Sequence, residues 1–202
     1  MAGLRFKKGF TFMETLFTVA IFSVITTVIF SVFMVGVSSW QIGEAKTQSQ
    51  EGSRRAMEMI AKELRLASSY RLQILNDSGA PVFSGTRIIF QVPVYSQQQI
   101  QLDTSGQLTW GAGGTQGYWV SYRLIIPHEA TAGQLKRIIL ASNKTTEISS
   151  AVLANNVAGV EFNGLPNNTY TPSSIEIILT KRGIDREANR NTILKSRIWL
   201  RN

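Results

Sequence analysis

The chain has 202 residues, of which 44% are hydrophobic, carries a formal net charge of +8 and contains no cysteine. This length suits one ordinary domain with a remainder. The absence of cysteine excludes disulfides, thiol chemistry and cysteine-based metal sites. The positive charge is spread along the chain, which is typical of a solvated surface and does not by itself indicate a nucleic-acid-binding protein.

The first element in chain order is an apolar segment near the N-terminus. Residues 15 to 43 contain no Asp, Glu, Lys or Arg, and the run TLFTVAIFSVITTVIFSVFMVGV is long enough to cross a ~30 Å hydrocarbon core as a helix. Arg5, Lys7 and Lys8 precede it with no acidic residue nearby, which predicts a cytoplasmic N-terminus. We expect a membrane span over about residues 15–38, with Trp40 as an interfacial anchor at its far end.

Glu14 lies at the mouth of this apolar segment, where an ionisable group costs a few kcal/mol. A secretory signal peptide would have a shorter apolar region followed by an A-x-A-like cleavage site, and no such site occurs before Trp40. A plain membrane anchor matches the length but leaves Glu14 unexplained. The segment therefore indicates something more specific than either.

The stretch KKGFTFMETLF and the apolar run after it resemble the class III leader of type IV pilins and type II secretion pseudopilins. The resemblance implies that a prepilin peptidase cleaves between Gly9 and Phe10 and that Phe10 is N-methylated. Glu14 would become the fifth residue of the mature chain. In a filament its carboxylate would pair with the N-terminal amine of a neighbouring subunit, because a charge buried among apolar helices needs an opposite charge. Phe12 and Met13 stand where the family more often has Leu and Ile or Val.

The helical pattern continues beyond the apolar segment to about Tyr70. A stripe of apolar residues at three- and four-residue steps predicts one buried face, formed by Met57, Ile60, Leu64 and Ala67. The charged residues between them are expected to point outward, with Glu58 and Lys62 as an i,i+4 pair: Arg54, Arg55, Glu58, Lys62, Glu63 and Arg65. We expect one helix over residues 10–70, its first half in the membrane and its second half packed on a domain.

After Tyr70 the pattern changes to short apolar runs and alternation, which predicts strands separated by turn-rich segments. The predicted strands cover residues 87–94, 98–103, 107–111, 118–126, 135–142, 157–164, 174–182 and 193–202. The sequence therefore predicts a leader at 1–9, the long helix at 10–70 and an antiparallel β domain at 71–202. This is an α+β arrangement with the layout of pilins.

The segment RRAMEMIAKELRLAS and the two terminal strands resemble two groups of minor subunits: the J-type minor pseudopilin of type II secretion and the PilW-like minor pilins. The resemblance implies a structural subunit with no catalytic activity, inserted in the bacterial inner membrane with a periplasmic domain. Its partners would be other pilin or pseudopilin subunits, the prepilin peptidase and assembly platform proteins. A J-type subunit would act in the tip complex of a pseudopilus, and a PilW-like subunit in a type IV pilus for adhesion, motility or DNA uptake. A third alternative is a tip module that binds a ligand or DNA.

Few residues suggest reaction chemistry. His128 is the single histidine, and no G-x-S-x-G motif accompanies it. The glycine-rich stretch 111–117 is not followed by a helix start, which a phosphate cradle requires, and so it predicts a hairpin loop. The aromatic residues of the strands are expected to lie in the core or in cross-strand pairs: Trp110, Tyr118, Trp119, Tyr122 and Trp199.

One polar cluster has the two-residue spacing that begins a calcium-binding loop: Asp185, Glu187, Asn189 and Asn191. The sixth position of such a loop would be Arg190 rather than Gly, and the twelfth would be Ser196 rather than Glu. We therefore expect a solvated hairpin turn and no cofactor, with calcium as the alternative.

Overall fold

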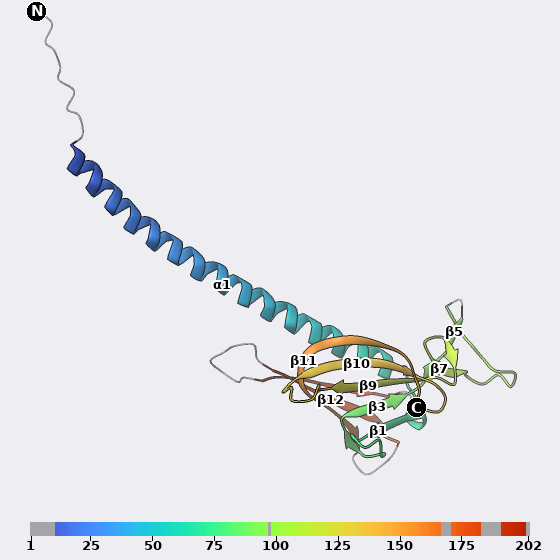
Figure 1. Ribbon diagram of the computed structural model, residues 1–202. Coiled ribbons are helices and arrows are strands. Elements are labelled where there is room, and N and C mark those ends of the chain that lie inside the picture. The colour runs from blue at the N-terminus through green and yellow to red at the C-terminus, as the bar shows by residue number, and fades with distance from the viewer. Residues whose placement is uncertain (1–10, 97, 167–170, 183–190, 201–202) are drawn as a thin grey trace, which may run out of the picture. The chain divides into compact units, whose positions relative to one another are not determined.

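The computed structural model describes residues 11–96, 98–166, 171–182 and 191–200, without the side chains of 45, 46, 48 and 49. Two compact units, Met1–Thr47 and Gln48–Asn202, divide the chain. The helix α1 (Phe12–Leu64) supplies the described part of the first unit except Thr11, and it continues into the second unit (Figure 1). The antiparallel sheet belongs to the second unit, so the predicted α+β class is confirmed.

The helix ends earlier than its pattern predicts, at Leu64 rather than about Tyr70. The amides of Leu66 and Ala67 donate to carbonyls three residues earlier, at 3.1 and 3.0 Å, which is how a last helical turn tightens. Serines follow at once, and their hydroxyls compete with helical hydrogen bonds. The chain then forms a short 3₁₀ turn, η1 (Ser69–Arg71), before the first strand.

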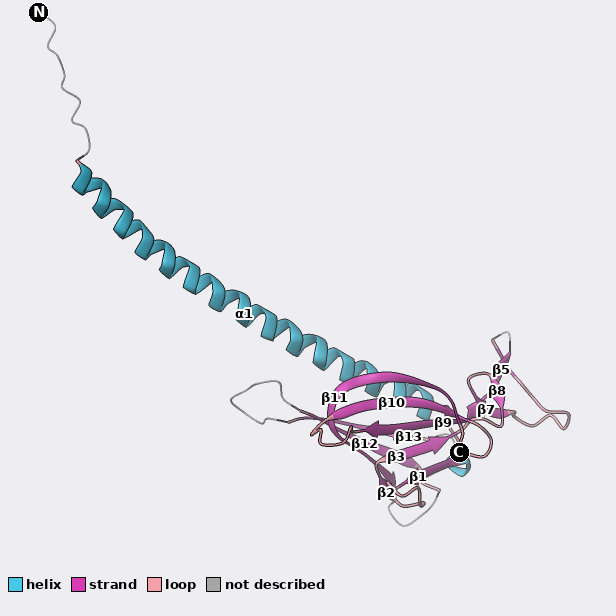
Figure 2. Cartoon of the chain, in the orientation of Figure 1, coloured by secondary structure: helices cyan, strands magenta, loops and turns pink. Residues whose placement is uncertain are grey.

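The second unit contains a strongly curled antiparallel sheet (Figure 2). Its strands are β1 (Leu72–Leu75), β2 (Ser84–Gly85), β3 (Arg87–Phe90), β9 (Trp119–Ile125), β10 (Gly133–Leu140), β11 (Glu147–Leu165), β12 (Ser174–Lys181) and β13 (Thr192–Trp199). Their order across the sheet is β1-β3-β9-β10-β11-β12-β13, and β2 pairs with β11.

The curl of the sheet depends on β11. Its first half pairs with β10 and its second half with β12, and three register shifts interrupt the pairing with β10. Such irregularities bend a strand and increase its twist. The sequence predicted only residues 157–164 of this strand, because the first residues, EISSAV, are exposed and lack an alternating apolar pattern.

Smaller sheets extend from the main one. The predicted strand 87–94 is divided into β3 and β4 (Val92–Pro93), and β4 joins β7 (Trp110–Ala112) and β8 (Thr115–Gln116) in a separate sheet. The strands β5 (Tyr95–Ser96) and β6 (Gln99–Ile100) form a further hairpin. The turn between β7 and β8 contains Gly113 and Gly114 with φ of 58° and 79°, as a type I′ hairpin requires. The predicted hairpin at 111–117 is therefore confirmed.

The main core lies between the end of α1 and one face of the curled sheet. All four residues of the predicted stripe are buried, and Ile60 and Leu64 have no exposed surface. They pack with the inward-facing residues of the strands, among them Ile88, Phe90, Val120, Tyr122, Leu135, Phe162, Ile177 and Leu179. The stripe prediction is confirmed, and this packing is what fixes the helical segment on the sheet.

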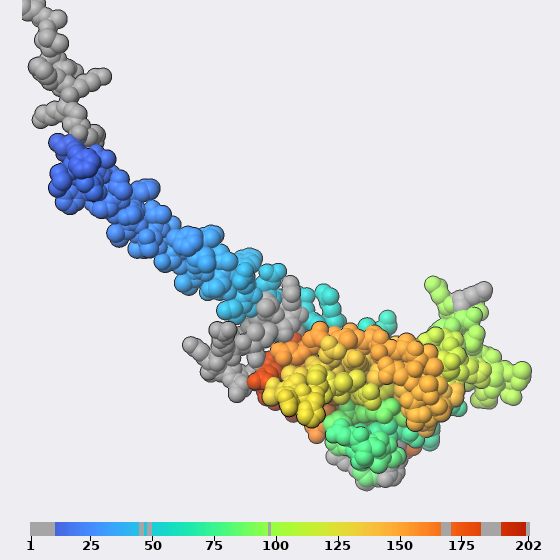
Figure 3. All heavy atoms as spheres, viewed as in Figure 1, coloured from blue at the N-terminus to red at the C-terminus, as the bar shows by residue number. Residues whose placement is uncertain are grey.

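The opposite face of the sheet has a smaller buried cluster of its own: Leu75, Ile89, Ile138 and Leu140, with Trp119 packed against it. Segments near β1–β3, in green, and near β9–β11, in yellow to orange, gather on the side of the domain that Figure 3 shows. The sheet therefore presents two faces of different composition, one covered by the helix and one carrying this smaller cluster.

Candidate functional site

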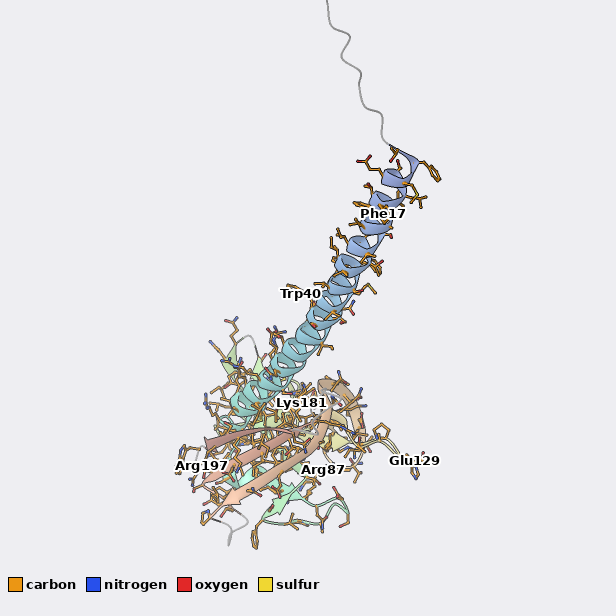
Figure 4. All side chains as sticks on the ribbon, turned by 90° about the vertical axis from the view of Figure 1, so that its left-hand side faces the viewer. Phe17, Trp40, Arg87, Glu129, Lys181 and Arg197 are labelled. Carbon is orange, nitrogen blue, oxygen red and sulfur yellow. The ribbon has the colours of Figure 1, made fainter. Side chains whose placement is uncertain are left out.

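The first half of α1 is the first candidate site, because none of the described residues covers its apolar surface. The segment Phe12–Glu44 spans 33 residues, is long and apolar enough to cross a membrane, and has none of its most apolar stretch buried. Phe17 and Trp40 project from the bare helix in Figure 4. A surface of this kind needs lipid or other apolar helices around it.

Most hydroxyl groups in this segment are satisfied locally. Thr18, Ser23, Thr26, Thr27, Ser31 and Ser38 donate to backbone carbonyls three or four residues earlier, at 2.7–2.9 Å. A polar group inside a bilayer needs an internal partner, because water is absent there. The segment therefore presents an apolar surface despite its many serines and threonines.

Glu14 lies in the first turn of α1 with its side chain exposed. The backbone amide of Glu14 donates a hydrogen bond to the Thr11 hydroxyl at 3.3 Å, so Thr11 acts as the N-cap residue. The spacing from Thr11 to Glu14 is that of a capping box, and a carboxylate in the first turn is favourable beside the helix dipole. Within the part of the chain that the structure describes, no cation forms an ion pair with the Glu14 carboxylate.

The remaining residues of the predicted leader site precede the described range. Gly9 and Phe10, at the expected cleavage point, and Arg5, Lys7 and Lys8 all lie outside the described residues. Cleavage, methylation and the cytoplasmic orientation therefore remain predictions. Of the predicted assembly site, the structure describes Glu14.

A second charged site, which the sequence analysis missed, lies between the end of α1 and the sheet. The Arg137 guanidinium contacts the Glu63 carboxylate through Nε at 3.0 Å and through Nη2 at 2.9 Å. The Tyr122 hydroxyl donates to the other carboxylate oxygen at 2.5 Å. Tyr122 and Arg137 are register partners on neighbouring strands, so the sheet positions both donors. The prediction that Glu63 points outward is wrong.

The electrostatics of this trio favour one charge arrangement. Burial raises the pKa of the Tyr122 hydroxyl, and the Glu63 carboxylate raises it further, so the hydroxyl remains a donor. Burial alone would lower the pKa of Arg137, but the hydrogen bonds and charge of Glu63 outweigh it and the pKa is raised. The Arg137 and Glu63 side chains are each 22% exposed, so water screens this pair only in part.

The signal for Glu63 in the sequence is slight. It lies three residues after Ile60 and next to Leu64, at the border of the buried stripe, but Arg137 is 74 residues away. The expected pair of Glu58 with Lys62 does not form, since Glu58 binds Arg54 at 3.1 Å on the exposed face. The geometry of the trio holds the helix to the sheet.

A further polar contact joins the same two elements. The Lys181 ammonium, on β12, donates to the Ser53 hydroxyl at 3.2 Å, and both residues are buried. Burial lowers the pKa of Lys181, because a low-dielectric surrounding disfavours the charged form. This contact adds a second polar attachment of the helix to the sheet.

The aromatic residues of the strands only partly follow the expectation. Tyr122 is fully buried, as predicted. Trp199 is 66% exposed, so the prediction that it lies in the core is wrong. Each strand tryptophan carries a cation over its ring: Arg71 on Trp110 at 5.4 Å, Lys144 on Trp119 at 4.3 Å and Arg197 on Trp199 at 5.1 Å. A cation on the face allows a tryptophan to remain partly exposed.

The other polar candidates do not form a site in the described residues. His128 is exposed in the β9–β10 loop, 3.8 Å from Glu129. Of the calcium candidates, Asp185, Glu187 and Asn189 lie outside the described residues, and Asn191 is exposed. Across the residues that the structure describes, no group of three or more His, Asp or Glu side chains could hold a metal ion.

A groove of about 720 Å³ lies beside Glu63. Its lining combines apolar side chains, including Met59, Tyr95 and Leu153, with the charged ends of Arg55 and Lys62. Its two carboxylates, those of Glu58 and Glu63, are already bound by Arg54 and Arg137. The groove therefore offers apolar surface rather than a set of reactive groups.

A scan of the sequence against protein-family models finds no match, and a search of curated proteins finds none either. Sequence and structure define the class of protein: an α+β chain with one N-terminal helix able to span a membrane and an antiparallel β domain. The layout is compatible with a pilin-like fold.

Proposed function

We propose that the chain is a minor pilin-like subunit that assembles through its N-terminal helix into a pseudopilus, in the tip complex of a type II secretion system. The observation that carries this proposal is Glu14, an exposed carboxylate in the first turn of an uncovered apolar helix. No described residue of the same chain neutralises it. A second subunit is therefore the natural source of its partner.

The physical mechanism is charge pairing during helix association. Cleavage after Gly9 would create a positive amine on Phe10, four residues before Glu14 in the sequence. When apolar helices bundle, an unpaired carboxylate among them costs several kcal/mol, and pairing with a neighbour's amine offsets part of that cost. The pairing would thus select a defined axial offset between neighbouring subunits. The apolar surface of Phe12–Glu44 supplies the packing.

The subunit would first reside in the bacterial inner membrane, with its N-terminus in the cytoplasm and its β domain in the periplasm. There it would meet the prepilin peptidase, other pseudopilins and the assembly platform proteins. The Glu63–Arg137 pair and the buried stripe would transmit force between helix and sheet when the subunit moves out of the membrane. The proposed role needs no catalytic group and no cofactor.

Processing is the first test. The chain is expressed with and without an active prepilin peptidase, and the N-terminus is determined by mass spectrometry. We expect loss of residues 1–9 and a methyl group on Phe10 only when the peptidase is present. An intact N-terminus in its presence would refute the pilin-like assignment.

The second test concerns Glu14 itself. Glu14→Gln keeps the capping-box spacing but removes the charge, so the helix start is preserved while the pairing is lost. We expect membrane insertion to be unchanged and recovery of the subunit in sheared filaments to fall about tenfold or more. The matched control is Glu58→Gln, an exposed carboxylate on the same helix, which should incorporate normally. Normal incorporation of Glu14→Gln would contradict the pairing role.

The choice between a J-type and a PilW-like subunit is tested by complementation. The gene is introduced into one strain that lacks its J-type pseudopilin and another that lacks its PilW-like pilin. Restored protein export in the first strain would support the proposal. Restored piliation in the second strain alone would replace the secretion role with the pilus role.

A further inference from the structure

Three basic residues form a row across the face of the sheet that carries the smaller buried cluster. Arg87 on β3 is the register partner of Arg123 on β9, and Arg123 is the register partner of Lys136 on β10. Residues directly opposite each other project from the same face, and neighbouring strands lie about 4.8 Å apart. Three positive charges therefore start from adjacent points on one surface (Arg87 is labelled in Figure 4).

This face is the one turned away from the Glu63 trio. Tyr122 and Arg137 point toward α1, and side chains alternate between the two faces along each strand. Arg123 follows Tyr122 and Lys136 precedes Arg137, so both lie on the other side. Leu75, from the smaller buried cluster, continues the row beyond Arg87.

The charge of the row is not neutralised within the described chain. Arg87 donates from Nε to the Ser121 hydroxyl at 3.2 Å, which supplies no negative charge. Among the described residues, the buried Nε atom of Arg123 has no hydrogen-bond partner, and neither Arg123 nor Lys136 forms an ion pair. Asp77, the acidic residue nearest to Arg87 along the chain, accepts a hydrogen bond from Thr86 instead.

An ordinary structural role does not account for this row. Like charges directly opposite each other in a sheet are destabilising, and a buried donor without a partner costs about 1–3 kcal/mol. Lysines and arginines protect sheet edges, but β9 is an interior strand between β3 and β10. Burial lowers the pKa of Arg87, and the positive charge of Arg123 lowers it further. The surroundings of Arg87 therefore disfavour its positive charge.

We propose that Arg87, Arg123 and Lys136 bind a dianionic phosphate group, either inorganic phosphate or a phosphomonoester. Two guanidinium forks and one ammonium match the geometry of phosphate oxygens, and the buried Arg123 Nε would gain its missing acceptor. A dianion offsets most of a threefold positive charge, whereas a carboxylate or a phosphodiester carries one negative charge. The Ser121 hydroxyl, already at Arg87, lies in the next row of the same face. This inference does not rest on the proposed function in filament assembly.

The test uses the full chain, purified in a non-ionic detergent without phosphate, and isothermal titration calorimetry at constant ionic strength. The probes are inorganic phosphate, dimethyl phosphate and acetate. We expect saturable binding of one phosphate per chain. Dimethyl phosphate and acetate should bind at least about tenfold more weakly than phosphate. No saturable phosphate binding, or equal responses to all three anions, would overturn the proposal.

Variants assign the binding to the row. Arg123→Gln and Lys136→Gln should each weaken phosphate binding about tenfold, because each removes one of three charged donors. Lys195→Gln, at an exposed position on β13, is the control and should change affinity less than twofold. The melting temperature without phosphate should be unchanged or higher in Arg123→Gln, since the substitution relieves repulsion. If Lys136→Gln retained wild-type phosphate affinity, or if the control lost as much affinity as the row variants, the assignment would be wrong.

Discussion

The two halves of α1 have the same backbone conformation but opposite relations to their surroundings. In the first half the apolar side chains cover every side of the helix and none is buried within the chain. In the second half the residues of one apolar stripe are buried against the sheet, and most of the charged residues lie on the exposed side. Apolar content alone therefore does not locate a core. The angular distribution of the apolar residues does, because a sheet can cover only one side of a helix.

The polar groups of the two halves of α1 also differ in where their hydrogen-bond partners lie. In the first half, hydroxyls bond to the helix backbone a few residues away. In the second half, Glu63 and Ser53 bond to residues of distant strands. Local satisfaction leaves a helix free to associate with lipid or other helices, whereas distant partners attach it to one particular sheet.

The largest effect should come from truncating the buried stripe. Ile60 has no exposed surface, so Ile60→Ala creates a cavity and should lower the free energy of unfolding of the β domain by about 3–4 kcal/mol. Ile25→Ala removes the same atoms from the uncovered half and should change that free energy by less than about 0.5 kcal/mol. Urea unfolding of the full chain in detergent, followed by tryptophan fluorescence, measures both. Equal losses would mean that the two halves do not differ as described.

Removing the cation of the half-buried pair should have the next largest effect. Arg137→Met leaves the Glu63 carboxylate without its counter-charge and should cost roughly 2 kcal/mol, less than for a fully buried pair because water reaches both groups. Arg54→Met breaks the exposed pair with Glu58 and should cost about 0–0.5 kcal/mol. The same unfolding experiment compares them. If Arg137→Met were neutral, the pair would not attach the helix to the sheet.

The smallest effect concerns the Tyr122 hydroxyl. Near pH 8, Tyr122→Phe should cost about 1 kcal/mol, since one hydrogen bond to Glu63 is lost. The raised pKa of Tyr122 means that the folded state keeps this proton above pH 10, where an unfolded tyrosine loses it. The folded state then binds more protons, so the stabilisation by Tyr122 is complete below about pH 10 and declines as pH rises further.

The difference between wild type and Tyr122→Phe should therefore shrink between about pH 9 and pH 11, as measured by urea unfolding at each pH. The lowered pKa of Lys181 has the opposite effect, because it makes the free energy of unfolding increase as pH rises toward the ordinary lysine pKa. Wild type and Tyr122→Phe share this contribution, so it cancels in the difference between them. A difference that does not change with pH would show that the folded state does not hold the Tyr122 proton more tightly than the unfolded chain.

Sequence reasoning worked where the cause of a structure is local. The apolar run, the stripe of Met57, Ile60, Leu64 and Ala67 and the hairpin at 111–117 each depend on residues close in the chain. It failed where the cause is distant. The first half of β11 lacks an apolar pattern and is a strand because β10 pairs with it, and the helix end at Leu64 follows from a turn that the periodicity does not mark.

By itself, the sequence determined that this chain has an uncovered apolar helix with a carboxylate in its first turn, followed by an amphipathic helix and a β domain. Periodicity and hydropathy specify these features, since they act over a few residues. Only the tertiary structure decided which charges are paired. The register of β3, β9 and β10 brings Arg137 to Glu63 on one face and aligns Arg87, Arg123 and Lys136 on the other. A shift of one residue in the strand pairing would move these side chains to the opposite face, and this register cannot be read from a short stretch of sequence.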